Sequence, residues 1–229
     1  MCGISGKFNL SLKEINNIDR HLKLMNKLQA HRGPDGEGLW VHPKKIVGFG
    51  HRRLSIIDLE TGDQPLSDEH GNTICYGGEI YNYIELKKQL KSSYLFKTKS
   101  DTEVILAAYK KWGIDCLSHL RGMFSFAIWD ENKKKLFCAR DRFGIKPFYY
   151  TIVGDEFIFA SEAKALLPFL KDIETDFEGL KDYFVFQFPL NGKTLFKNVK
   201  QILPAHYMEI SQSEIKTHQY WEVNYILLI

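Results

Sequence analysis

The stretch 123–160, MFSFAIWDENKKKLFCARDRFGIKPFYYTIVGDEFIFA, decides the fold class of this 229-residue chain. It consists of short apolar and aromatic runs separated by turn residues at 130–132 and 154–155. This pattern predicts four strands, at 124–129, 135–139, 147–153 and 156–160. We expect the four strands to form one antiparallel meander.

The sequence on either side of this stretch adds strands and amphipathic helices. Strands are predicted at 2–8, 46–57 and 73–76, and helices at 18–28, from about residue 82, at 104–120, at 162–170 and at 177–186. The pairs Asn82 with Glu85 and Ser100 with Glu103 have the spacing of helix capping boxes, which places Asp101 at a helix entrance. Short strands follow at 194–221. The fold class is therefore α+β, with helices outside and antiparallel sheets inside.

Composition excludes several classes of protein. The chain is 44% hydrophobic, which suits a substantial core, and its net charge of +3 with scattered lysines disfavours nucleic acid as a partner. No apolar run approaches the roughly 20 residues that span a membrane, and the N-terminus has no signal-peptide features. We expect a cytoplasmic protein with free thiols, since its four cysteines form no C-x-x-C pair.

No linker divides the chain, so we expect one domain over residues 2–221. Residues 222–229 are interpreted as the remnant of a linker to a further domain.

Cys2 is the residue whose position is most unusual. Met1 is readily removed when the second residue is small, and removal leaves a thiol and a free α-amine on the same residue. A thiolate is the attacking species; free cysteine has a pKa of about 8.5, and an α-amine with a pKa of about 7.7–8.0 can accept its proton. Met-Cys-Gly alone is weak support for such chemistry, because most second residues are ordinary.

The motifs that follow Cys2-Gly3-Ile4 strengthen this interpretation. In order they are HRGPDG at 31–36, HRRLSIID at 51–58, GEIYN at 78–82, SDTE at 100–103 and RDRFGIKP at 140–147. Over nearly the whole chain this series closely resembles the glutaminase domain of glutamine-hydrolysing asparagine synthetases of the B type. Pro34 favours that branch, because sugar-phosphate amidotransferases have a tyrosine at this position.

The resemblance implies a fold and an activity. The fold is a four-layer αββα sandwich of two antiparallel sheets flanked by helices, the N-terminal-nucleophile (Ntn) hydrolase type. The activity is that of a class II glutamine amidotransferase, in which Cys2 hydrolyses the side-chain amide of L-glutamine to glutamate and ammonia.

The resemblance also implies how glutamine is held. Arg53 would bind the α-carboxylate and Asp101 the α-ammonium, with Glu79 and the main chain of Gly78 nearby and main-chain contacts from Ile56. Taken singly, Arg53 is better interpreted as a surface ion-pair partner and Asp101 as a plain helix cap, so the binding roles depend on the ordered set of motifs.

Other polar residues in the motifs receive structural interpretations. Arg140 and Asp141 are expected to form an ion pair that shapes the pocket. His31 and His51 are interpreted as loop or packing residues and no metal site is expected, because no third ligand at metal spacing accompanies them.

Gly77 departs from the family pattern Phe-Asn-Gly-Glu, because this chain reads Tyr76-Gly77-Gly78-Glu79. In the family the asparagine side chain is one of two donors to the oxyanion. The hole would then depend on the Gly78 N–H, and losing one such donor costs about 10²–10³ in turnover. We expect slow hydrolysis; the alternative is a catalytically weak glutamine-binding or scaffold module.

A synthetase half is the other expected partner. The family's second half binds ATP and Mg²⁺ and amidates aspartate, but no Ser-Gly-Gly-x-Asp-Ser loop occurs in this sequence. No cofactor is expected in this chain. The expected partners are L-glutamine and an ATP-dependent synthetase domain or separate synthetase chain, and a homodimer remains an open option. The ammonia acceptor is also left open.

Overall fold

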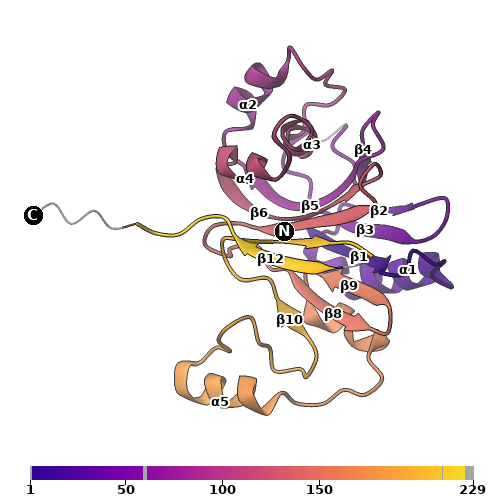
Figure 1. Ribbon diagram of the computed structural model, residues 1–229, viewed down its shortest axis with the longest axis vertical. Coiled ribbons are helices and arrows are strands. Elements are labelled where there is room, and N and C mark those ends of the chain that lie inside the picture. The colour runs from indigo at the N-terminus through magenta and orange to yellow at the C-terminus, as the bar shows by residue number, and fades with distance from the viewer. Residues whose placement is uncertain (1, 59–60, 213, 225–229) are drawn as a thin grey trace, which may run out of the picture.

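Two six-stranded antiparallel sheets lie face to face in this protein (Figure 1). The computed structural model describes residues 2–58, 61–212 and 214–224. The first sheet has the order β10-β8-β9-β1-β3-β2 and the second β12-β11-β7-β6-β5-β4. The strands are β1 (Gly3–Asn9), β2 (Gly36–Val41), β3 (Val47–Arg53), β4 (Leu66–Ser67), β5 (Thr73–Ile80), β6 (Gly122–Asp130), β7 (Lys135–Arg140), β8 (Tyr149–Val153), β9 (Glu156–Ala160), β10 (Lys200–Gln201), β11 (His206–Ile210) and β12 (Ile215–Gln219).

Helices α1 (Ile18–Leu28), α2 (Tyr83–Leu90), α3 (Asp101–Trp112) and α4 (Cys116–His119) cover the outer faces of the sheets, whereas α5 (Phe177–Phe186) lies away from both sheets. The 3₁₀ turns are η1 (Ala30–Arg32), η2 (Gly113–Asp115), η3 (Ala163–Ala165) and η4 (Leu167–Phe169). In Figure 1, α2, α3 and α4 lie together above the second sheet, whereas α1 lies beside the first.

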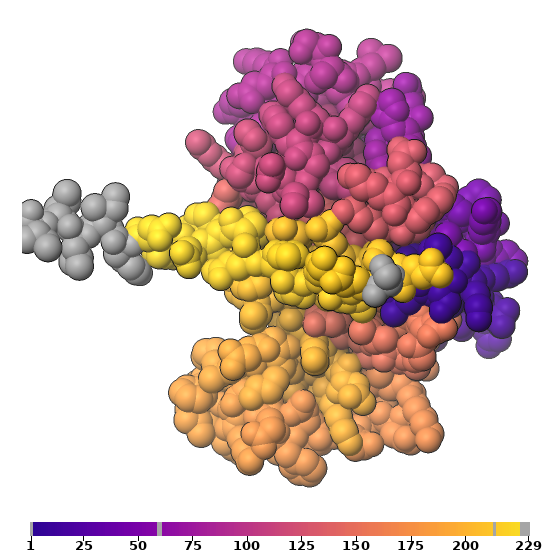
Figure 2. Space-filling view, viewed as in Figure 1, coloured from indigo at the N-terminus to yellow at the C-terminus, as the bar shows by residue number. Residues whose placement is uncertain are grey.

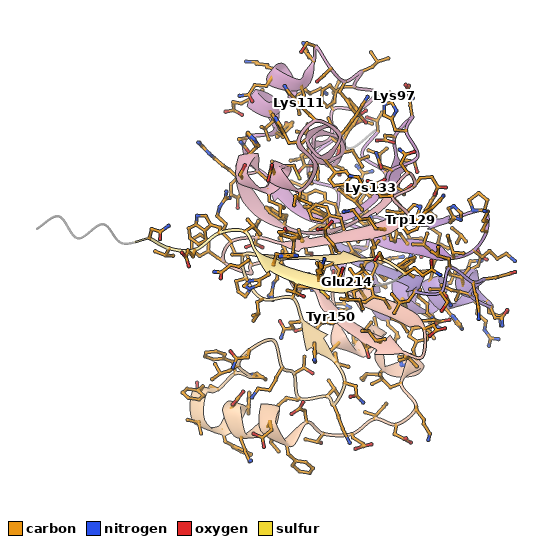
Figure 3. The ribbon with its side chains drawn as sticks, in the orientation of Figure 1. Lys97, Lys111, Trp129, Lys133, Tyr150 and Glu214 are labelled. Atoms are coloured by element: carbon orange, nitrogen blue, oxygen red, sulfur yellow. The ribbon has the colours of Figure 1, made fainter. Side chains whose placement is uncertain are left out.

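Three separate apolar cores show that the molecule has four layers. Ile18, Leu22 and Met25 of α1 pack on the first sheet, since their spacing places them on one helix face. A second core joins the two sheets, and Trp129, labelled in Figure 3, contributes to it with its ring centroid 5.3 Å from that of Phe8. A third core lies between the second sheet and the helices α2, α3 and α4. The αββα prediction is confirmed.

Strand register positions the two segments that will matter for the site. The first residues of β1 pair with the end of β3, Gly3 opposite Arg52 and Ile4 opposite His51. In the second sheet, Gly77 lies opposite Ser125 and Gly78 opposite Phe124 on β6. Strands β1 and β5 contact each other across the sandwich, and a Cβ at Gly77 of β5 would lie 3.6 Å from Ile4 Cγ2 near the start of β1.

The predicted meander is wrong in one respect. The strands β6 and β7 belong to the second sheet, while β8 and β9 belong to the first. The segment 141–148 between them is long enough to cross from one sheet to the other. Local patterning shows where strands form, but partners such as β1, which pairs with β9, decide the sheet.

Several predicted boundaries also need correction. Strand β2 was not predicted, β3 ends at Arg53 rather than at residue 57, and β5 continues to Ile80. The helix predicted at 104–120 is divided at Gly113, whose φ of 60° ends α3, and 162–170 forms two 3₁₀ turns.

Neither predicted capping box forms. Asn82 has no side-chain cap bond and instead donates to His119 O and accepts from Arg121 N. Ser100 does cap α3, accepting from Thr102 N at 3.1 Å.

The C-terminal hairpin of β11 and β12 crosses the middle of one face, between the helices around α3 and the segment around α5 (Figure 2). The segment 222–224 has no regular secondary structure, and 225–229 of the predicted linker remnant lie outside the described residues. Within the described ranges, no helix combines the length and apolar character needed to cross a bilayer.

Candidate active site

The Cys2 thiol is held by the main chain of a neighbouring loop. Leu54 N donates to Cys2 Sγ at 3.4 Å, and Sγ lies 3.6 Å from Leu54 O. The carbonyl oxygen of Cys2 accepts from Arg32 Nε at 3.2 Å, and Arg32 is itself paired with Glu162 at 3.0 Å. Cys2 therefore has a fixed position before β1. The predicted removal of Met1 concerns a residue outside the described ranges.

Cys2 also differs from the other cysteines in exposure. Cys75, Cys116 and Cys138 are fully buried, and burial raises the pKa of each of these thiols. Their thiolates are strongly disfavoured, so Cys2, which is half-buried, is the cysteine suited to nucleophilic chemistry.

A single pocket brings together most of the predicted site residues. Cys2, Arg53, Ile56, Gly78, Glu79 and Asp101 all line it. They come from four parts of the chain: the residue before β1, the end of β3 with its loop, β5, and the first residue of α3. Gly77 is not in the lining, but a side chain at this position would point at Cys2, as described below.

Arg53 reaches the pocket from the end of β3 and is largely buried. Its Nη1 donates to Asp63 Oδ1 at 2.8 Å, and its Nη2 donates to the carbonyl oxygen of Asp58. Asp63 is 88% exposed, so this ion pair is weak and a carboxylate entering the pocket can replace it. In the absence of a ligand, Arg53 therefore forms an ion pair, as the alternative interpretation predicts.

Asp101 lies at the N-terminus of α3 and is 4% exposed. Its Oδ2 accepts from the Tyr76 hydroxyl at 2.8 Å and from Ile80 N at 3.0 Å. Burial raises the pKa of Asp101, while these two hydrogen bonds act in the opposite direction. A buried carboxylate held in this way is positioned to bind a cation, and Glu79 provides a second carboxylate in the same pocket wall.

The main chain of β5 presents one N–H to the pocket. In an antiparallel ladder, alternate residues point their N–H groups away from the neighbouring strand. Tyr76 N donates to Gln64 Oε1 and Ile80 N to Asp101 Oδ2, so both point away from β6. Gly78 lies between them, and its N–H points the same way, where it can donate to a ligand.

The face of β5 on which a side chain at Gly77 would stand is turned toward Cys2. A Cβ at this position would lie 3.5 Å from Cys2 O, 3.6 Å from Ile4 Cγ2 and 3.8 Å from Cys2 Cβ, which are ordinary contacts. A side chain therefore fits there and would extend beside Cys2. At Gly78 the same Cβ would lie 2.2 Å from Met123 O, so this position accepts only glycine.

Lys146 is a pocket residue that the motifs did not single out. It lines the pocket, is 6% exposed, and burial lowers its pKa. It lies within the motif RDRFGIKP, of which only Arg140 and Asp141 were given a role, a structural one. Tyr76 and Gln64 also line the pocket without having been predicted there; only their contacts across the fold reveal them.

The predicted ion pair between Arg140 and Asp141 is wrong for the described residues. Arg140 donates to the carbonyl oxygens of Gly144, Lys146 and Ile202. Asp141 accepts from main-chain amides, including those of Phe124 and Lys146. Both residues fix the loop that follows β7 through main-chain contacts.

His31 and His51 make contacts with other parts of the fold and do not line the pocket among the described residues. His51 is buried, its Nε2 lies 3.1 Å from Tyr76 O, and burial lowers its pKa to about 4. His31 lies 3.1 Å from Glu162. Within 2–58, 61–212 and 214–224, no three His, Cys, Asp or Glu side chains are arranged to hold a metal ion.

Comparison with known proteins gives a consistent result. The family described as "Glutamine amidotransferase domain" matches residues 1–221. Asparagine synthetase (glutamine-hydrolyzing) 1 of Bacillus subtilis is 45% identical over 98% of this chain and 36% of its own length. Amidase chry2 of Gibberella zeae is 41% identical over 86% of this chain and 30% of its own. The chain thus spans about a third of the length of these relatives.

A solved structure shares the fold. Glutamine phosphoribosylpyrophosphate amidotransferase from B. subtilis superposes with a TM-score of 0.68 at 21% identity, covering 96% of this chain and 49% of that one. At this identity the likeness concerns the arrangement of layers rather than the chemistry.

Proposed function

This chain belongs to the glutamine amidotransferase domain family, and on that basis we propose that it hydrolyses the side-chain amide of L-glutamine to glutamate and ammonia with Cys2 as the nucleophile. The observation that carries the proposal is the convergence of Cys2, Arg53, Glu79 and Asp101 on one pocket. These residues are distant in the sequence, and the motifs had already predicted that they form one site.

The charges of the pocket suit a free amino acid. Arg53 offers a planar guanidinium for a bidentate contact with the α-carboxylate, in place of its contact with Asp63. Asp101 and Glu79 offer two carboxylates to the α-ammonium. A zwitterion bound in this way extends its side chain toward the remaining wall, where Cys2 lies.

The reaction then follows from the groups around Cys2. The thiol proton passes to the α-amine of the same residue once Met1 is gone, and Sγ adds to the amide carbon. The oxyanion accepts the Gly78 N–H, the protonated α-amine gives its proton to departing ammonia, and water cleaves the glutamyl thioester. Leu54, whose N–H lies 3.4 Å from Sγ and whose carbonyl oxygen lies 3.6 Å from it, holds the sulfur in position for attack.

The ammonia is assigned to an ATP-dependent synthetase. Two relatives support this assignment, because proteins called asparagine synthetase and amidase are about three times as long as the segment that matches this chain. We infer that ATP and Mg²⁺ act there, on the same polypeptide or on a separate chain, and that asparagine or a related amide is formed.

The second candidate function is a glutamine-binding or scaffold module with little turnover. Gly77 favours it, because the position facing Cys2 has no side chain to donate a hydrogen bond. The two functions share the binding residues and differ only in chemistry at Cys2.

Labelling and turnover together test the proposal. Intact mass should show the loss of Met1, and a diazoketone analogue of glutamine should label the peptide of Cys2 with one equivalent. Ammonia release from glutamine should be lost in Cys2→Ala and kept in Cys116→Ala, whose thiol is buried away from the pocket. Glutamine binding without labelling or ammonia release would instead establish the second candidate.

A further inference from the structure

Lys146 is held in the pocket wall by the main chain of the loop after β7. Its N–H donates to Asp141 Oδ2 at 2.9 Å, and its carbonyl oxygen accepts from Arg140 Nε at 2.7 Å. Because both partners are buried, these contacts hold the loop firmly. Lys146 therefore lines the pocket from a backbone that these contacts fix.

The ammonium group of Lys146 is buried without a direct polar contact in the described part of the chain. Among the described residues it forms no ion pair and its side chain forms no hydrogen bond, although it is 6% exposed. Placing an unpaired cation in such surroundings disfavours folding. A contribution to stability therefore does not explain why a lysine stands at this position, which lines the same pocket as Cys2.

Charged groups surround Lys146 at longer range. It interacts electrostatically with Glu79, Arg32, Cys2 and Asp141. Glutamine bound as proposed would bring its α-ammonium to Glu79 and Asp101, so these carboxylates would be occupied. The positive charge of Lys146 would then face the reaction centre with little compensation.

We propose that the ammonium group of Lys146 is the counter-charge for the negative reaction centre at Cys2, first the thiolate and then the oxyanion. The inference rests on the proposed glutaminase chemistry. It explains how the pocket supports negative charge although Gly77 supplies no side-chain donor. Fixed charges in a pocket shielded from water stabilise developing charge without reorganisation.

The step requires no proton from Lys146. The Sγ–carbon bond forms while the π electrons of the amide carbonyl move to oxygen, and Lys146 stays protonated throughout. When the carbonyl re-forms and the carbon–nitrogen bond breaks, the negative charge disappears. Lys146 therefore acts by charge, and arginine can replace it whereas methionine cannot.

Alkylation of Cys2 by iodoacetamide tests this without glutamine. The rate is read from the mass of the Cys2 peptide across the neutral pH range, in the wild type and in Lys146→Met, Lys146→Arg and Lys88→Met. The last is a matched control, since Lys88 is exposed on α2 and outside the pocket. Lys146→Met should slow alkylation of Cys2 about tenfold at the lower pH values, because the thiolate loses a neighbouring positive charge.

Other charges near Cys2 are the same in every variant, so they do not produce the difference. They are its own α-amine, Arg32 on η1, Arg53 on β3, Glu79 on β5 and Asp101 on α3. His51 is neutral in this range because its pKa is about 4.

Stability separates electrostatic action from a structural role. Lys146→Met should unfold at the same temperature as the wild type or higher, because it removes a buried unpaired charge. Lys146→Arg should restore the alkylation profile. The inference is wrong if Cys2 of Lys146→Met is alkylated with the wild-type profile, or if Lys146→Arg behaves like Lys146→Met. If the methionine variant does not fold, Lys146→Gln takes its place in the same measurements. Absence of ammonia release by the wild type would refute the proposed function instead, and alkylation would still report on Lys146.

Discussion

Replacing Gly77 by asparagine is the most direct perturbation of the proposed oxyanion hole. The position faces Cys2, and the three atoms nearest to a Cβ added there belong to Cys2 and Ile4, at 3.5–3.8 Å. The substitution therefore requires no movement of β5. The amide group of the new side chain would extend beside Cys2 Sγ and offer a second N–H donor next to that of Gly78.

The expected gain follows from the cost of losing such a donor elsewhere. One oxyanion donor is worth about 10²–10³ in kcat, or about 2.7–4 kcal/mol. Gly77→Asn should raise kcat for ammonia release toward that factor and leave KM within about threefold, because Arg53 and Asp101 are unchanged. Ammonia release coupled to glutamate dehydrogenase measures both constants.

Two alanine variants serve as controls for this experiment. Gly77→Ala adds the same Cβ without an amide and should not raise kcat. Gly78→Ala places a Cβ 2.2 Å from Met123 O and should lower both the unfolding temperature and the activity. An asparagine variant that folds like the wild type and turns over no faster would refute the placement of the oxyanion hole.

Three further outcomes are expected. Arg53→Lys should raise KM for glutamine at least about tenfold with a smaller change in kcat, because the bidentate contact is lost; steady-state kinetics measures this. Asp101→Asn should abolish saturable glutamine binding in calorimetry but raise the unfolding temperature at neutral pH. Burial raises the pKa of Asp101, so the ionised carboxylate destabilises the fold increasingly as the pH rises through that pKa. The gain in unfolding temperature should therefore vanish in acid. Burial lowers the pKa of His51 from 6.5 to about 4, so the free energy of unfolding should fall by about 3 kcal/mol between pH 6.5 and pH 4 in denaturant titrations. His51→Gln should remove this pH dependence. If the pH dependence is unchanged in the variant, other groups cause it.

Short-range patterns predicted the elements better than their assembly. The strands around 124–129 and 156–160 were placed from apolar runs bounded by turns, and α1 from the spacing of its buried residues. Strand β2 was missed because Gly36 and Gly38 interrupt its apolar pattern. The sheet to which β8 and β9 belong depends on pairing with β1, more than a hundred residues away, which no local signal contains.

The site was predicted where the ordered motifs and the family that they resemble singled out a residue. Arg53 and Asp101 carry charges that a motif can single out, and they do line the pocket with Cys2. Gln64 could not be found in this way, since its role is a hydrogen bond to Tyr76 N across a loop. Lys146 was within a quoted motif, but its lack of a partner among the described residues becomes visible only in three dimensions.

The support of Cys2 Sγ by Leu54 involves only peptide groups, a donor N–H and an acceptor C=O. Any amino acid other than proline supplies both, so the position of the sulfur depends little on which side chain occupies position 54. Leu54 also lines the pocket. Position 54 is therefore a place where an engineer can vary the pocket wall while these main-chain contacts to the sulfur are kept.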